Sequence, residues 1–122
     1  MQFIDRIIAL ELSLHTYSAQ RNDSVWLDKV LHQDFHEITK SGDLVSRSEV
    51  IAALLSEDDV VEYHGYDYQL MNVTQSSVIL IYKTQMAKNP IPTLRSSHWI
   101  LNALGEWQLI FHQGTISRIT ES

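Results

Sequence analysis

The chain has 122 residues, of which 44% are hydrophobic and 20% are charged, and its net charge is -6. This length suits one domain around one core, so we expect residues 1–122 to form a single domain. The nine basic residues are scattered and cysteine is absent, which argues against nucleic-acid or membrane partners and excludes disulfides and zinc–thiolate sites. No secretory signal or stretch of roughly 20 apolar residues is evident, so we expect a cytoplasmic protein.

The first half of the chain predicts helices. Apolar residues recur at spacings of three and four from Phe3 to Tyr17, the stripe of an amphipathic helix. Asp23 or Ser24 can cap a second, shorter helix. The segment Ser46-Arg47-Ser48-Glu49 matches the Ser-x-x-Glu capping box and predicts a third helix, with apolar residues of segment 50–55 on one face.

One short segment between the predicted helices, and most of the chain after them, predict strands. A short extended segment, Asp34–Ile38, comes first, and from Val60 onward the apolar pattern changes to a period of two. The continuous apolar run Val78–Tyr82 predicts a central strand covered on both faces. The prolines of Lys88–Pro92 predict a loop, and a tight turn at Ala103–Glu106 joins the last two strands. Helices followed by a meander predict an α+β fold, with N-terminal helices packed on an antiparallel sheet.

The last two predicted strands carry polar residues among large apolar ones. Trp99 and Trp107 lie on either side of the turn, and serine, histidine and glutamine are interleaved with them. A strand that buries only hydrocarbon needs no such polar residues, and a solvated strand needs no tryptophans. This mixture therefore predicts a sheet face that lines a pocket of mixed polarity.

Three segments carry a resemblance to a known family. They are Asp34-Phe35-His-Glu37-Ile-x-x-Ser-Gly42, Ser46-Arg47-Ser-Glu49-Val-Ile, and the run from Arg95-Ser-Ser-x-Trp99 to Gly105-Glu-Trp107-Gln-Leu-Ile-Phe-His112-Gln113-Gly-Thr115. With this order of elements, the chain resembles the nuclear-transport-factor-2-like superfamily, also called SnoaL-like or cystatin-like, and within it the small stand-alone bacterial domains. The resemblance implies a curved sheet wrapped into a cone by the first helices, a cavity between them, and a homodimer through the outer sheet face. The superfamily includes isomerases, cyclases, dehydratases, adaptors and oligomerisation modules, so the resemblance implies a fold and not one activity.

Glu37 is the first candidate for a functional residue. It lies two residues after Phe35 on the same predicted strand, so both side chains point to one face. A carboxylate in an apolar cavity can serve as a general base. The alternatives are a structural or ligand-orienting acid, held by an arginine or by backbone N–H groups, and a simply exposed side chain.

Arg95 is the second candidate, on the strand that carries Ser97 and Trp99 at the same parity. Because Trp99 is expected inside, Arg95 is expected at the mouth of the cavity. Its guanidinium group can pair with Glu37 or clamp an anionic ligand, since it matches a carboxylate with two parallel hydrogen bonds. A solvated arginine at the start of a strand is the alternative.

The sequence does not decide whether His112 or Gln113 of the last strand points into the cavity. Phe111 and Gln113 share one face and His112 has the other, whereas the resemblance implies that both His112 and Gln113 matter. A bulge near Gly114 can bring both into one cavity; otherwise one of them faces the dimer interface. His112 is a candidate general base, with a hydrogen-bonded structural histidine as the alternative.

The expected pocket and its cofactors follow from these assignments. The pocket residues are expected to be Trp26, Phe35, Glu37, Arg95, Ser97, Trp99, Phe111 and Gln113. No metal is expected, because His32 and His36 have a ligand-like spacing but a helix-to-strand change lies between them. No cofactor is expected either, because the chain has no phosphate-cradling glycine loop or dinucleotide motif.

Three functions remain open at this stage. The first is a homodimeric small-molecule-binding domain with a pocket of mixed polarity, either without catalysis or weakly catalytic. The second is a cofactor-free isomerase, dehydratase or cyclase resembling ketosteroid isomerase, with Glu37 as base and a tyrosine or His112 as hydrogen-bond donor. The third is an interaction or dimerisation module that uses the outer sheet face.

Overall fold

The structure of the protein is a computed structural model that describes residues 3–15, 20–57 and 63–118. Within these ranges the elements, in chain order, are α1 (Phe3–His15), the 3-10 turn η1 (Gln20–Asn22), α2 (Ser24–Val30), β1 (Leu31–Ile38), β2 (Leu44–Ser46), α3 (Arg47–Leu55), β3 (Tyr63–Thr74), β4 (Ser77–Met86), β5 (Thr93–Leu101) and β6 (Trp107–Ile116). None of the helices described is long and apolar enough to cross a membrane.

The six strands form one sheet in the order β2-β1-β6-β5-β4-β3. Strands β3 to β6 are the predicted antiparallel meander. However, β1 pairs with β6 in parallel, so the sheet is mixed and the expectation of a purely antiparallel sheet was wrong in this respect. The reason is topological: parallel neighbours need a long crossover, and everything from β2 to β5 lies between these two strands.

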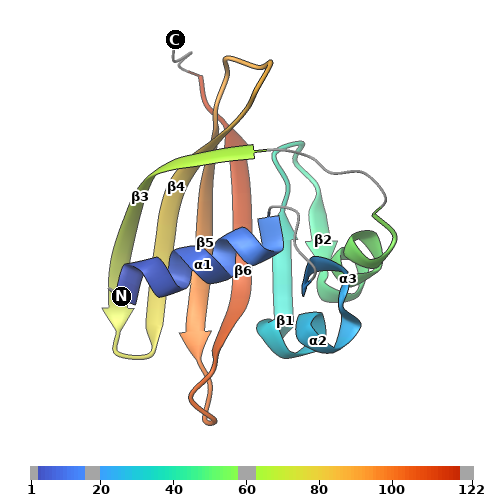
Figure 1. Cartoon of the computed structure of the whole chain (residues 1–122), viewed down its shortest axis with the longest axis vertical. Helices are drawn as coiled ribbons and strands as arrows, with labels where there is room; N and C mark the ends of the chain where they lie inside the picture. Colours follow the sequence, from blue (N-terminus) through green and yellow to red (C-terminus); the bar gives the residue numbers. More distant parts are fainter. Residues whose placement is uncertain (1–2, 16–19, 58–62, 119–122) are drawn as a thin grey trace.

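The helices occupy the places that let the sheet enclose a core. Figure 1 shows α1 running across the sheet over β3 to β6, with α2 and α3 beside β1 and β2. The predicted cap of α2 is confirmed, because the Asp23 carboxylate accepts from the backbone N–H groups of Val25 and Trp26. The strand β1 is longer than predicted and begins immediately after α2. Tyr17, the last residue of the predicted first helix, lies outside the described residues.

The capping box of α3 is confirmed. The Ser46 hydroxyl accepts from the Glu49 N–H at 3.4 Å, and the Glu49 carboxylate accepts from the Ser46 N–H at 3.2 Å. The hydrogen bond from the Ser46 side chain, followed by that from its backbone, lowers the pKa of Glu49. Val50 and Leu54 are half-buried as expected for the inner face, but Leu55 is 42% exposed.

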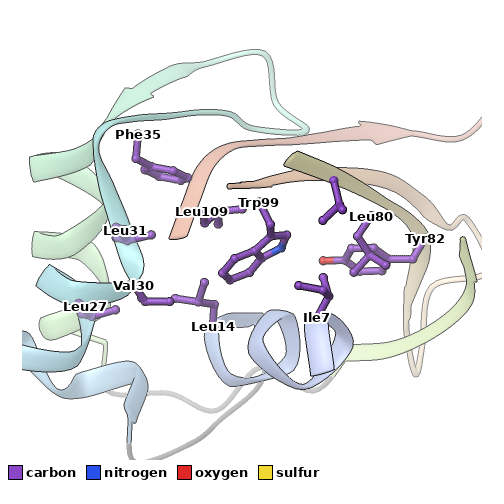
Figure 2. Close-up of a cluster of buried hydrophobic side chains, with 11 residues drawn as sticks. Ile7, Leu14, Leu27, Val30, Leu31, Phe35, Leu80, Tyr82, Trp99 and Leu109 are labelled. Carbon is purple, nitrogen blue, oxygen red and sulfur yellow. The ribbon is translucent and has the colours of Figure 1, made fainter. Parts of the chain in front are cut away.

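The core lies between α1, α2 and the inner face of the sheet, where Trp99 occupies the centre (Figure 2). Within the run Val78–Tyr82 of β4, the buried residues are Val78, Leu80 and Tyr82, whereas Ile79 is half-buried and Ile81 is 38% exposed. The expectation that this apolar run is covered on both faces was therefore wrong for the single chain. The residues alternate across the pleat of β4, and the outer face stays open.

We predict that Ser46→Ala lowers the free energy of unfolding by about 1 kcal/mol, because it leaves an N–H group of the first turn of α3 without its acceptor. Urea unfolding followed by circular dichroism measures this change. The matched control is Ser48→Ala in the same turn, which should stay within about 0.5 kcal/mol of the parent. Equal midpoints for both variants and the parent would show that the cap contributes nothing to stability.

Candidate functional site

A pocket of about 360 Å³ lies between α3, β1, β2 and the inner face of the sheet. Most of its wall is apolar, formed by Leu14, Leu31, Phe35, Val45, Val50, Ala53, Leu54 and Leu109. Its polar side chains are Arg21, Glu37, Thr39, Glu57, Thr84 and Arg95. The lining is thus of mixed polarity, and α3 and β2 contribute to it as well as the inner face of the sheet.

Two of the four charged groups in the pocket neutralise each other. Arg21, on η1, forms two contacts with the Glu57 carboxylate, at 2.8 Å from Nε and 2.9 Å from Nη2. The side chains of this pair are 12% and 26% exposed. Both residues line the pocket, whose other charged lining residues are Glu37 and Arg95.

Glu37 and Arg95 reach this pocket from different strands. Glu37 shares the inward face of β1 with Phe35, as predicted, and is half-buried. Arg95 comes from β5 and donates from Nε to the Thr84 hydroxyl at 2.7 Å. Its guanidinium group crosses Gly114 of β6, where an added Cβ would lie 3.2 Å from Arg95 Nη1. The missing side chain at Gly114 therefore leaves the space that the guanidinium occupies.

Beside the pocket, a buried carboxylate lies at the centre of a polar cluster that the sequence reasoning did not identify. Glu11 of α1 is 1% exposed. Its Oε2 accepts from the Tyr82 hydroxyl at 2.6 Å and from the Ser97 hydroxyl at 2.8 Å, while Oε1 accepts from Trp99 Nε1 at 2.9 Å. Figure 2 shows the Tyr82 hydroxyl and the Trp99 nitrogen pointing toward one another above α1. Three donors compensate the loss of water around this carboxylate.

A signal for Glu11 was present in the sequence. It lies four residues after Ile7 and three before Leu14, both of which belong to the apolar stripe of the first helix. An acid within such a stripe is buried with its helix face. Its donors come from strands about 70 to 90 residues later, and no local pattern connects them to it.

Ser97 and His112 connect this carboxylate to the pocket. The Ser97 Oγ lies 2.6 Å from His112 Nδ1, and His112 Nε2 lies 3.4 Å from Arg95 Nη1. The side chains of Glu11, Ser97, His112 and Arg95 thus form a continuous hydrogen-bonded chain from α1 to the pocket lining. The arrangement is not a hydrolytic triad, because Ser97 is 0% exposed and its hydroxyl donates to a carboxylate.

A bulge in β6 decides which of its residues face the core. The partners change from Trp99↔Leu109 to His98↔Phe111, so Ile110 is the extra residue. The bulge therefore lies at Ile110, four residues before Gly114, near which the sequence had suggested one. As a result His112 is inside and 1% exposed, whereas Gln113 pairs with Ser96 on the opposite face.

The structure brings three of the eight expected pocket residues together around this cavity, namely Phe35, Glu37 and Arg95. Ser97 and Trp99 share the inner face but are buried in the Glu11 cluster. Phe111 and Gln113 lie on the outer face because of the β6 bulge. Trp26 lines a separate groove of about 390 Å³ between α1 and α2, together with Trp107.

Burial changes the acid–base behaviour of two tyrosines near Glu11. Desolvation, followed by the charge of Glu11, raises the pKa of Tyr82 well above its usual value. The same two causes raise the pKa of Tyr68, whose ring stacks on Tyr82 with centroids 5.0 Å apart. The Tyr82 proton is therefore retained at neutral pH and committed to Glu11.

The two histidines with ligand-like spacing make local contacts instead. His32 Nδ1 accepts from the Asp34 N–H, and His36 Nδ1 lies 2.7 Å from the Asp34 carbonyl oxygen. Across the ranges that the structure describes, no three acidic or histidine side chains come together in a way that could hold a metal ion.

Comparison with known proteins identifies the fold. No protein-family profile matches the chain, and no curated protein matches it in sequence. Among solved structures, it is similar to an NTF2-like protein from Cytophaga hutchinsonii, with a TM-score of 0.75 and 24% identity over 96% of this chain and 100% of that one. A proposed ketosteroid isomerase from Parabacteroides distasonis gives a TM-score of 0.73 and 11% identity, covering 96% and 89% of the two chains.

A third similar structure is a proposed calcium/calmodulin-dependent kinase II association domain from Exiguobacterium sibiricum. Its TM-score is 0.68 and its identity is 12%, covering 98% of each chain. At these identities the likeness concerns the backbone arrangement alone. The helices, the curved open sheet and these structural matches agree with the resemblance stated from the sequence, and the chain therefore has the α+β cone of the nuclear-transport-factor-2-like, or cystatin-like, fold.

Proposed function

We propose that the chain is a cytoplasmic, homodimeric small-molecule-binding domain whose ligand enters the pocket beside α3. One observation carries this proposal: Glu37 and Arg95 line a largely apolar cavity of about 360 Å³ together with Phe35. A cavity of this kind suits a small molecule with an apolar body and one polar or anionic group. Arg95 would hold the polar group, and Phe35 and Leu54 would contact the apolar body.

The Arg21–Glu57 pair supports the same assignment. Because Arg21 and Glu57 are paired with each other, we assign the polar group of a ligand to the part of the lining that holds Arg95. There the guanidinium is braced by Thr84 and by His112, so it loses little side-chain freedom when a ligand binds.

We predict that 8-anilino-1-naphthalenesulfonate, which joins an apolar aromatic body to a sulfonate, binds the purified protein at one saturable site. Ala53→Phe should weaken this binding by about tenfold or more, because the ring fills the space into which Ala53 faces. Fluorescence titration measures the affinity.

The matched control for this experiment is Ala52→Phe. Ala52 is exposed on the same helix and does not line the pocket, so the added ring should leave the affinity unchanged. Non-saturable dye binding, or equal loss in both variants, would contradict the proposal. A thermal-shift screen of metabolites then identifies ligands, with Ala53→Phe as the filter against binding elsewhere.

The homodimer is proposed through the outer face of the sheet. Apolar side chains remain exposed there, including Met71 at 49%, Ile81 at 38% and Leu94 at 42%. Ile81 stands between Gln69 of β3 and Ser96 of β5 in the pairing register. An apolar run on β4 that is half open in one chain is explained if a second copy covers it.

We predict that Ile81→Lys converts the dimer to a monomer, because a lysine at the centre of the interface would be desolvated without a partner. Its neighbours Gln69 and Ser96 are polar, so the isolated chain should still fold. Light scattering after size exclusion gives the mass. Val25→Lys, which replaces a 77% exposed residue on α2, is the control and should remain dimeric. A monomeric parent protein would contradict the proposal.

A cofactor-free isomerase is the second candidate, favoured by one observation: Glu37 lies in the pocket lining and pairs with His112 in the β1–β6 register. In this candidate Glu37 moves a proton between two carbon atoms of a bound ketone. Tyr82 does not serve as the donor to the oxyanion, because its hydroxyl is committed to Glu11. Arg95 is the cationic group in the same lining that would stabilise the developing negative charge.

We predict, for this second candidate, that the protein converts a β,γ-unsaturated ketone to its conjugated isomer, and that Glu37→Gln lowers kcat by about a hundredfold or more while KM changes little. Absorbance of the conjugated product measures the rate. Glu57→Gln is the control, since Glu57 also lines the pocket but is held by Arg21. Equal activity of Glu37→Gln and the parent, or no activity in the parent, would rule this candidate out.

A further inference from the structure

We propose that Glu11 is a positioning residue: acting through Ser97, it fixes the tautomer of His112 and thereby the place of the Arg95 guanidinium in the pocket lining. The four side chains form one hydrogen-bonded chain, with separations of 2.8, 2.6 and 3.4 Å between successive polar atoms. Glu11 itself is not among the residues that line the pocket. The shortest separations between its carboxylate and the pocket lining run through Ser97 and His112, and His112 Nδ1 also lies 3.7 Å from Glu11 Oε2.

The direction of every hydrogen bond in the chain follows from its two ends. An arginine N–H can only donate, so His112 Nε2 must accept from Arg95. A neutral His112 then carries its proton on Nδ1 and donates it to the Ser97 oxygen. Ser97 in turn donates its own proton to the Glu11 carboxylate. One protonation pattern satisfies all three bonds.

Because of Trp99, the Glu11→Gln substitution is expected to reverse the donor and acceptor roles along these hydrogen bonds. The indole N–H can only donate, so it requires an oxygen at the Oε1 position of residue 11. The amide nitrogen of the glutamine is thereby placed where Oε2 lies now, facing both Ser97 and Tyr82, and its two N–H groups can donate to the two hydroxyl oxygens. Ser97 must then accept from the amide and donate to His112 Nδ1. His112 would carry its proton on Nε2, directed at the N–H of Arg95, and the guanidinium would have to move away.

The hydrogen bond from Tyr82 to Glu11 provides a matched control. Tyr82 donates to the same Oε2 atom as Ser97 does, at 2.6 Å, but it is not part of the chain to Arg95. Tyr82→Phe therefore removes a hydrogen bond from the same buried carboxylate and leaves the Ser97–His112 link in place. A merely structural role of Glu11 would make the two variants alike, whereas a positioning role separates them.

The test is the tautomer of His112, read from its imidazole 15N shifts by NMR at neutral pH and assigned by the loss of the signals in His112→Asn. We expect the Nδ1–H form in the parent and in Tyr82→Phe, and the Nε2–H form in Glu11→Gln. If Glu11→Gln does not fold, Ser97→Ala replaces it. His112 then keeps only the long, 3.4 Å contact with Arg95 and loses the 2.6 Å contact with Ser97, so the Nε2–H form should appear beside the Nδ1–H form. An Nε2–H or doubly protonated ring in the parent, or an unchanged Nδ1–H form in Glu11→Gln or Ser97→Ala, would overturn the proposal.

The consequence for the pocket rests on the proposed function and is measured separately. Affinity for 8-anilino-1-naphthalenesulfonate should fall about tenfold in Glu11→Gln and change less than about twofold in Tyr82→Phe. If the parent does not bind the dye, the proposed function fails, but the NMR result still decides the role of Glu11. If the tautomer changes and the affinity does not, the His112 tautomer does not control the place of Arg95, and the proposal is overturned.

Discussion

The burial of the Glu11 carboxylate is the constraint on which the rest of this structure depends. An ionised group taken out of water costs several kcal/mol unless donors surround it. Here Tyr82, Ser97 and Trp99, from two adjacent strands, supply those donors. Because each donor reaches one particular oxygen, α1 can dock on the sheet in only one register. An apolar residue at this position would pack the helix without specifying that register.

The same constraint links the core to the pocket. Ser97 donates to Glu11 and lies 2.6 Å from His112, which in turn lies against Arg95. Glu11, Ser97 and His112 do not line the cavity themselves, but their hydrogen bonds extend to Arg95, which does. The inner face of the sheet thus has two regions. Around Trp99 it packs against α1, and beside α3 and β2 it lines the pocket, where Thr84 and His112 hold the Arg95 guanidinium.

The bulge in β6 places His112 on the inner face of the sheet, where both regions need it. Without the extra residue at Ile110, the alternation of β6 would place His112 on the same face as Gln108, away from Leu109. The chain from Glu11 to Arg95 would then be broken, and Gln113 would face the core in its place. The pocket polarity and the outer face are therefore set by one irregularity in one strand.

The sequence by itself determined what depends on neighbouring residues: the capped helices α2 and α3, the meander from β3 to β6, and the shared face of Phe35 and Glu37. Capping, turn chemistry and periodicity act over a few residues, so their signals are local. Only the tertiary structure decided the parallel pairing of β1 with β6, the position of the bulge, and the donors of Glu11. These depend on contacts between segments far apart in the chain, where a one-residue change of register moves a side chain from the core to the surface.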